Sequence, residues 1–146
     1  MQNKALKNSI QACEEVKAVL SVFDIESVIT GGIYTASRPL GNTKEDIVIN
    51  SVYFDADQVQ TGFLNINIHV PNMNNQAVGN PTAIDNTQPN VSRYKEIAAI
   101  VVTVIEGDIS KDFSISLRDS GELEGYKNDW YFNIGVEYEF LRTDLK

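Results

Sequence analysis

The chain has 146 residues, of which 42% are hydrophobic, and its 12 basic and 20 acidic side chains give a formal net charge of −8. This length and composition are typical of a globular domain, and we expect residues 1–146 to form one domain around a single core. The only cysteine, Cys13, and the only histidine, His69, exclude a disulfide framework and a zinc site built from several Cys and His ligands. Few familiar catalytic arrangements remain.

The acidic balance argues against a protein that binds nucleic acid by neutralising phosphates, because the 12 basic residues are scattered along the chain. The longest apolar run, residues 97–105, is interrupted by Thr103 and is far shorter than the roughly 20 residues that span a bilayer. Residues 1–15 lack the apolar stretch of a secretory signal. We therefore expect no membrane role, a protein that works in a cytoplasm, and a reduced cysteine.

Apolar residues recur at spacings of three and four over residues 3–23, which predicts an amphipathic helix with one buried stripe. Gly31 and Gly32 interrupt this pattern, and we expect them to let the chain leave the helix at a positive φ. β-Branched and aromatic residues favour a short strand over residues 33–35 and a longer strand over residues 46–54. A turn that contains proline and glycine separates the two strands.

Residues 64–70 alternate between apolar and polar side chains, which predicts a strand with one core face and one polar face. His69 belongs to the polar face. Residues 71–90 contain three of the four prolines and one charged side chain, and they show no periodicity. We expect them to form a long loop, which is uncommon inside a compact domain and usually functional. A second helix should follow this loop and end at Gly107.

The last third of the sequence alternates again over residues 113–118 and 130–140, which predicts two antiparallel strands. Residues 119–129 lie between them and are expected to form a hairpin tip or an extended β-arm. The order of elements favours an α+β domain. Its antiparallel or mixed sheet should have about five strands, with two helices packed on one face.

His69 is the only side chain whose ordinary pKa lies near neutrality, so it could act as a general base in a small hydrolase. The spacing selects no nucleophile and no orienting carboxylate for it, which favours a structural or interface role. Cys13 lies on the apolar stripe of the first helix and is expected in the core.

Carboxylates spaced by two residues could bind a divalent cation from one face of a strand. Three such pairs occur: Asp55 and Asp57, Glu122 and Glu124, and Glu137 and Glu139. No calcium-loop motif accompanies them, and we predict neither a metal site nor a cofactor.

Two long polar segments, residues 71–90 and 119–129, are unusual for a monomer, because ordering them costs conformational entropy. A neighbouring protein chain is the simplest element that could order them. No Lys or Arg lies between Lys44 and Arg93, so a partner would meet amides, backbone groups and isolated apolar side chains. The residues that we expect at such a contact are Asn72, Met73, Asn74, Val78, Ile84, Glu122, Leu123 and Tyr126.

The chain resembles the tail terminator or tail-completion proteins of tailed bacteriophages in its order of elements and in the stretch GGIYTASRPLGNTKEDIVINSV, residues 31–52. The resemblance covers most of the chain. It implies a sheet flanked by helices and a hexameric ring of subunits. Such a ring caps the head-proximal end of the tail tube, stops its growth and presents a surface to the neck.

The resemblance also implies partners: further copies of this chain, the tail tube protein, and the neck or connector proteins. DNA would pass through the ring without specific binding, because an acidic lumen repels phosphates. The candidates to line that lumen are Asp55, Asp57, Glu137 and Glu139. The expected location is the tail or neck of the virion and, during assembly, the host cytoplasm.

Two alternatives stay open. Another ring protein of the phage neck, such as a connector or a head-completion protein, would have the same kind of sequence. A small hydrolase or a ligand-binding module that uses His69 and the loop at residues 71–90 belongs to a different functional class.

Overall fold

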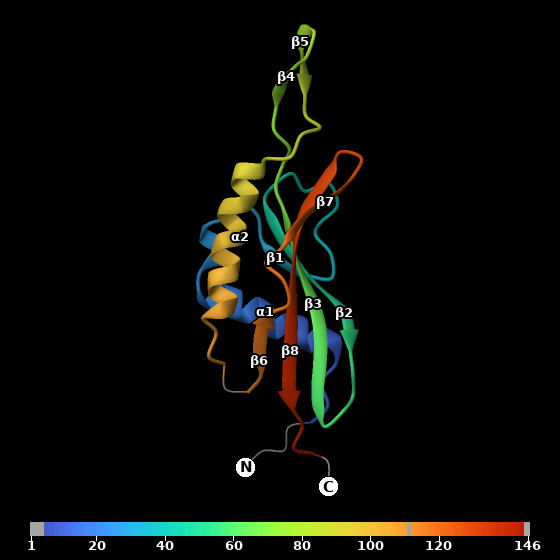
Figure 1. Cartoon of the computed structure of the whole chain (residues 1–146), viewed down its shortest axis with the longest axis vertical. Helices are drawn as coiled ribbons and strands as arrows, with labels where there is room; N and C mark the ends of the chain where they lie inside the picture. Colours follow the sequence, from blue (N-terminus) through green and yellow to red (C-terminus); the bar gives the residue numbers. More distant parts are fainter. Residues whose placement is uncertain (1–4, 111, 145–146) are drawn as a thin grey trace.

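A mixed β-sheet with two helices packed on one face makes up the α+β fold (Figure 1). The computed structural model describes residues 5–110 and 112–144. The elements are α1 (Ser9–Val22), a 3-10 turn η1 (Ile25–Ser27), β1 (Ile33–Thr35), β2 (Asp46–Phe54), β3 (Val59–His69), β4 (Asn75–Ala77), β5 (Asn80–Asp85), α2 (Val91–Glu106), β6 (Ser114–Leu117), β7 (Glu122–Tyr126) and β8 (Asp129–Leu141). None of the helices within the described residues is long and apolar enough to cross a membrane.

The main sheet has the strand order β1-β2-β3-β8-β6, and β7 also pairs with β8. β1 runs parallel to β2, and all other neighbours are antiparallel. The long strand β8 pairs along one edge with β3 and along the other with β7 and then β6. β8 therefore connects β2 and β3 on one side of the sheet with β6 and β7 on the other.

The core lies between the helices and one face of the sheet. Alternate residues of the three central strands point into it, as their period of two requires. The fully buried members on these strands are Ile47, Ile49, Leu64, Ile66, Ile68, Ile134, Val136 and Tyr138. The buried side of α2 packs against these residues through Tyr94, Ile97, Val101 and Ile105. The other sheet face, called the open face below, has no helix over it among the described residues.

The first helix begins later than the periodicity predicts. Asn8 is its N-cap, and a capping box joins Asn8 to Gln11: each side chain accepts a hydrogen bond from the other residue's backbone N–H. Residues 5–8 precede the helix, and residues 3 and 4 of the predicted helix lie outside the described residues. The second helix has Asn90 as its N-cap. It ends at Glu106 with Gly107 as its C-cap, in agreement with the predicted end at Gly107.

Two expectations about loops were wrong. Residues 71–90 contain a two-stranded hairpin, β4 and β5, where we expected a loop without secondary structure. Gly31 and Gly32 are not among the residues with positive φ. Gly31 is required for space instead, because a Cβ there would overlap with the backbone of Glu45 and the carboxylate of Asp46.

Candidate functional site

The most prominent surface feature is the arm, residues 71–90, which projects beyond the end of the main sheet (Figure 1). A two-residue turn, Val78 and Gly79, joins its strands, and Gly79 has a φ of 77° that favours glycine. Apolar side chains lie in solvent along it. Val78 is 103% exposed and Ile84 is 71% exposed. The arm therefore presents apolar surface where nothing in the described chain covers it.

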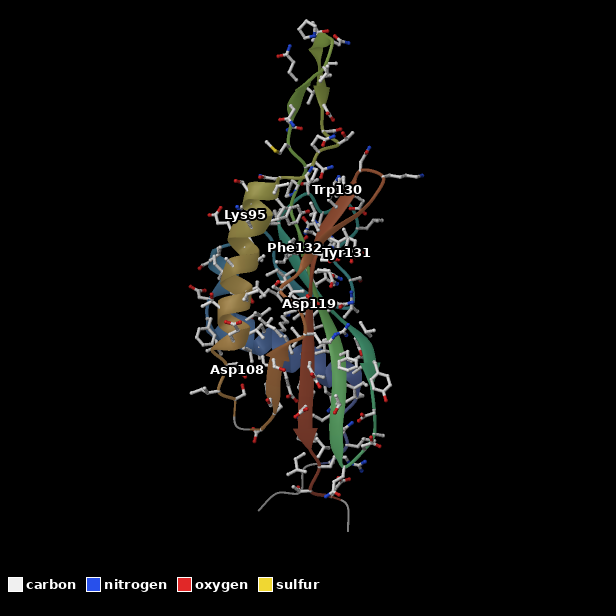
Figure 2. All side chains as sticks on the ribbon, in the orientation of Figure 1. Lys95, Asp108, Asp119, Trp130, Tyr131 and Phe132 are labelled. Atoms are coloured by element: carbon white, nitrogen blue, oxygen red, sulfur yellow. The ribbon has the colours of Figure 1, made fainter. Side chains whose placement is uncertain are left out.

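Hydrogen bonds from the domain fix the root of the arm. The side-chain amide of Asn72 donates to the carbonyl of Asn86 at 2.9 Å and to that of Asn128 at 2.7 Å. The indole Nε1 of Trp130 donates to the carbonyl of Thr87 at 2.9 Å, and Figure 2 labels Trp130 below the arm. Asn72 was predicted as a contact residue, but its donors are used inside the chain. It orients the arm rather than offering a free amide.

The second predicted excursion is a tight β-hairpin of β7 and β8. Glu124 accepts a hydrogen bond from the Tyr131 hydroxyl at 2.7 Å, and Glu122 lies on the same open face. Leu123 points to the other face and packs against the core, which leaves it little surface for a partner. Tyr126 pairs with Asp129 through the backbone, and its side chain lies outside the described part of the structure.

The predicted lumen residues divide into two groups. Glu137 and Glu139 lie on the open face of β8 opposite Phe63 and Thr61 of β3. Asp55 and Asp57 lie in the turn between β2 and β3, not on a strand. The Asp55 carboxylate accepts hydrogen bonds from the backbone N–H of Thr61 at 2.9 Å and of Asp57 at 3.3 Å. Asp55 therefore shapes the turn, and Glu137 and Glu139 are the better candidates for a solvent-facing acidic surface.

His69 lies on the polar face of β3, as predicted, beside a hollow of about 360 Å³ on the open face. Its ring is 5.9 Å from that of Tyr131, and its Nδ1 is buried without a hydrogen bond to any described residue. Burial, followed by the positive charge of Arg38, lowers the pKa of His69. A neutral imidazole with no hydrogen-bonded nucleophile lacks the arrangement of an activated catalytic pair.

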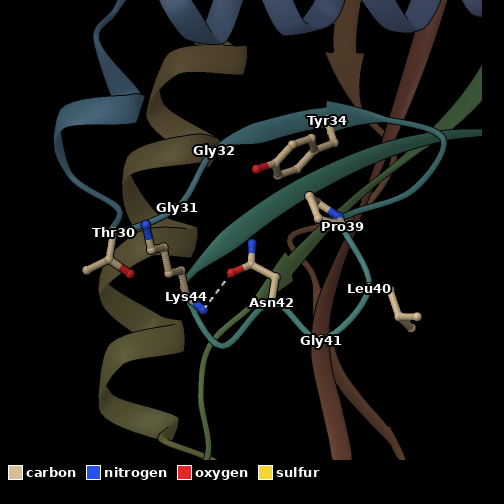
Figure 3. Close-up of a pocket in the computed structure, with 9 residues that line it drawn as sticks. All are labelled: Thr30, Gly31, Gly32, Tyr34, Pro39, Leu40, Gly41, Asn42 and Lys44. Carbon is tan, nitrogen blue, oxygen red and sulfur yellow. Dashed lines mark hydrogen bonds between the residues drawn. The ribbon is translucent and has the colours of Figure 1, made fainter.

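A second hollow, of about 390 Å³, lies beside the glycine pair and the loop that follows β1 (Figure 3). The glycine N–H groups are already used: Gly31 donates to the carbonyl of Glu45 at 2.7 Å, and Gly32 donates to Asp46 Oδ1 at 3.0 Å. The dashed line in Figure 3 marks the Lys44 N–H donating to Asn42 Oδ1. Backbone donors that are satisfied internally cannot bind a phosphate, so this loop is structural.

A third hollow lies between α1 and β2, and no pattern in the sequence predicted it. Its volume is about 520 Å³, and Ile10 and Cys13 of α1 face Ile49 and Ser51 of β2 across it. None of the described residues that line it is charged. Ile10 is 63% exposed at its mouth. We call this hollow the groove.

The described residues contain no group of three or more His, Cys, Asp or Glu side chains placed to hold a metal ion. The comparisons with known proteins add no assignment: no protein-family model matches the sequence, and no curated protein matches it either.

Proposed function

We propose that this protein is a non-catalytic structural subunit of a phage tail, of the tail terminator or tail-completion kind. In this function, copies of the chain form a closed ring, with about sixfold symmetry, at the head-proximal end of the tail tube. The ring ends tube growth, joins tail to neck and lets DNA pass. The observation that carries the proposal is the arm: a hairpin with a fixed root and exposed apolar side chains, which suits a contact with another protein.

Charge supports a contact between like copies at this arm. Copies with a net charge of −8 repel each other, and residues 71–84 carry no charge at all. Burial of a large aliphatic side chain such as Ile84 contributes about 1.5–3 kcal/mol. A contact that joins two different surfaces of one chain generates rings when the rotation closes, so an arm at one end of a subunit suits ring assembly.

The acidic side chains support passage of DNA. Glu122, Glu124, Glu137 and Glu139 all lie on the open face of the sheet. If this face lines the lumen, its negative charge repels phosphates, and the duplex slides without binding. The two ends of the ring would then contact the tail tube protein and the neck or connector proteins. The protein would be located in the virion and, during assembly, in the host cytoplasm.

Native mass spectrometry of the purified protein over a range of concentrations, together with symmetry-resolved images of the particle neck, tests this proposal. We expect closed rings of about six copies, and we expect Val78→Asp to weaken them. The control is Ala99→Asp, an exposed change on α2 far from the arm. A protein that stays a monomer in the particle contradicts the proposal. Rings of clearly higher symmetry would favour another connector of the neck.

A further inference from the structure

One edge of the main sheet is only partly paired. β1 pairs with Ile47–Ile49 of β2, and just after β1 the Ala36 N–H donates to the Ile49 carbonyl at 3.1 Å. Among the described residues, no strand pairs with Asn50–Phe54 on the β1 side. We call these five residues the edge. Unpaired edges of this kind accept an added strand from another chain.

The groove lies beside this edge, at the point where β1 stops. Its walls include Ile10 and Cys13 of α1, Ala36 after β1, and Ile49 and Ser51 of β2. A strand added along the edge would continue the line of β1 and lie over the groove. It would cover Ile10, which is 63% exposed. Backbone hydrogen bonds and apolar burial would therefore act at the same place.

We infer that the edge of one copy binds the arm of the next copy, with β4 added to β2 as an extra strand. Charge selects this occupant: none of the described residues that line the groove is charged, and residues 71–84 have no charged side chain, whereas the rest of the chain has a strong negative excess. Two copies can thus meet through these surfaces without bringing like charges into direct contact. The contact rests on the proposed function and deepens it, because it names the surfaces that join ring neighbours.

The two strands of the arm are not equivalent donors. β5 contains Pro81, which has no backbone N–H and interrupts a hydrogen-bond ladder. β4 and the residues before it, Asn72–Ala77, contain no proline and no charge. Within the described chain β4 pairs only with β5, and an isolated two-stranded hairpin is marginally stable in water. A third strand would stabilise the arm as well as the edge.

The contact has to be intermolecular. The arm leaves one end of the main sheet, whereas β2, whose last residue is Phe54, runs toward the other end (Figure 1). The arm and the edge are therefore different surfaces at different places on one subunit. Their pairing is head-to-tail and produces either a ring or an open chain.

Disulfide trapping tests the contact directly. The double variant Val52→Cys and Gln76→Cys places one thiol on the edge and one on β4. A disulfide requires Cα atoms about 4.4–6.8 Å apart, so it forms only if the strands pair. We expect a ladder of covalent oligomers in the full-length protein after mild oxidation. Cys13 does not compete, because it is buried and its pKa is raised to about 11.

The controls separate this contact from other pairings. Gln76→Cys combined with Ala99→Cys, an exposed position on α2, should give no ladder. Val52→Cys alone should form no covalent oligomers. A covalent dimer of Val52→Cys alone would mean that two edges pair with each other, and it would overturn the inference. Absence of a ladder from the double variant would overturn it too.

Charge substitutions give an independent test that needs no oxidation. Ile10→Glu at the groove should weaken self-association by about tenfold or more, whereas Ala18→Glu, on the exposed side of the same helix, should not. Adding Gln76→Lys to Ile10→Glu should restore association, because opposite charges then meet. Thermal unfolding of each variant establishes that it is folded. Association of Ile10→Glu at wild-type strength, or failure of the rescue, would count against the contact.

The two proposals can fail separately. Closed rings without a disulfide ladder would leave the proposed function intact and refute the arm-to-edge contact. A ladder from open chains that never close would support the contact and refute the ring.

Discussion

Arg38 and Asp46 form an ion pair with 2.8 Å between Nη2 and Oδ2, and the Asp46 side chain is 0% exposed. The same Arg38 nitrogen donates to the carbonyls of Asn42 and Lys44, and Gly32 N–H donates to Asp46. The pair therefore closes the loop between β1 and β2 and holds β1 at its place on the sheet. This ion pair is the main polar contact that holds β1, and the groove lies where β1 ends.

Arg38→Met should destabilise the fold by about 3–5 kcal/mol, because it leaves a buried carboxylate without its cation. Urea unfolding followed by fluorescence of Trp130 measures the loss. Lys44→Met is the matched control, since it removes an exposed cation from the same loop and should change stability by less than about 0.5 kcal/mol. Equal effects of the two substitutions would show that the buried pair is not the anchor.

Trp130→Phe should loosen the arm while the domain stays folded. The substitution keeps an aromatic ring but removes the Nε1–H that donates to the Thr87 carbonyl. We expect faster hydrogen exchange across residues 71–90 and a loss of about 1 kcal/mol in global stability. Tyr131→Phe is the control, because it removes the hydroxyl that donates to Glu124 in the neighbouring hairpin. Faster exchange of the arm in both variants would contradict a specific role for Trp130.

Periodicity predicted much of the fold from the sequence. The alternation over residues 64–70 placed the core and polar faces of β3 correctly, because one face is buried and the other is not. The same dependence on burial explains why periodicity did not predict the strands of the arm. Both faces of β4 and β5 lie in solvent, so burial imposes no alternation, and only the Val78–Gly79 turn pointed to a hairpin.

The start of α1 and the groove show two further limits of local reasoning. Asn8 and Gln11 are a capping signature that the sequence contains, and it defines the helix start better than apolar spacing does. The groove depends on where β1 stops relative to β2, which is a long-range pairing that no local pattern encodes. The exposure of Ile10 was equally hidden, because it results from the missing neighbour at the edge, whereas Cys13 and Val16 on the same side of α1 are buried.

Acid should destabilise the protein in two separate pH ranges. Burial, and then the charge of Arg38, lowers the pKa of His69 below 6.5, whereas Asp129 and Asp46 oppose this shift. The unfolded chain therefore binds the proton more tightly, and the free energy of unfolding falls as the pH drops below about 6.5. The hydrogen bond from Arg93 lowers the pKa of Glu45 from 4.5, and the stability that it contributes is lost as the pH falls below that value.

His69→Gln should flatten the first range only. Urea midpoints at intervals between pH 8 and pH 4 should show a smaller loss between about pH 6.5 and 5 in this variant than in the wild type. The decline below about pH 4.5 should persist, because it depends on Glu45 and Arg93. An unchanged slope near pH 6 would mean that His69 titrates alike in both states.

Tyr138→Phe tests how the segment before α1 is held on the sheet. The Tyr138 hydroxyl donates to Glu15 Oε2 at 2.7 Å and accepts from Lys7 Nζ at 3.1 Å, and Lys7 also contacts Glu15 at 2.6 Å. The ring is fully buried, and burial together with Glu15 raises the pKa of this tyrosine. Without the hydroxyl, the partly buried Lys7 and Glu15 still pair with each other. Both lose their hydrogen bond to Tyr138 of the sheet. We therefore expect a loss of about 1–3 kcal/mol in the free energy of unfolding and faster hydrogen exchange in residues 5–8.

The control is Tyr53→Phe, at a half-exposed ring on the open face, which should change the free energy of unfolding by less than about 0.5 kcal/mol. If Tyr138→Phe left stability and exchange unchanged, Gln60 would be the residue that holds this segment, because its side chain makes two hydrogen bonds with the Lys7 backbone.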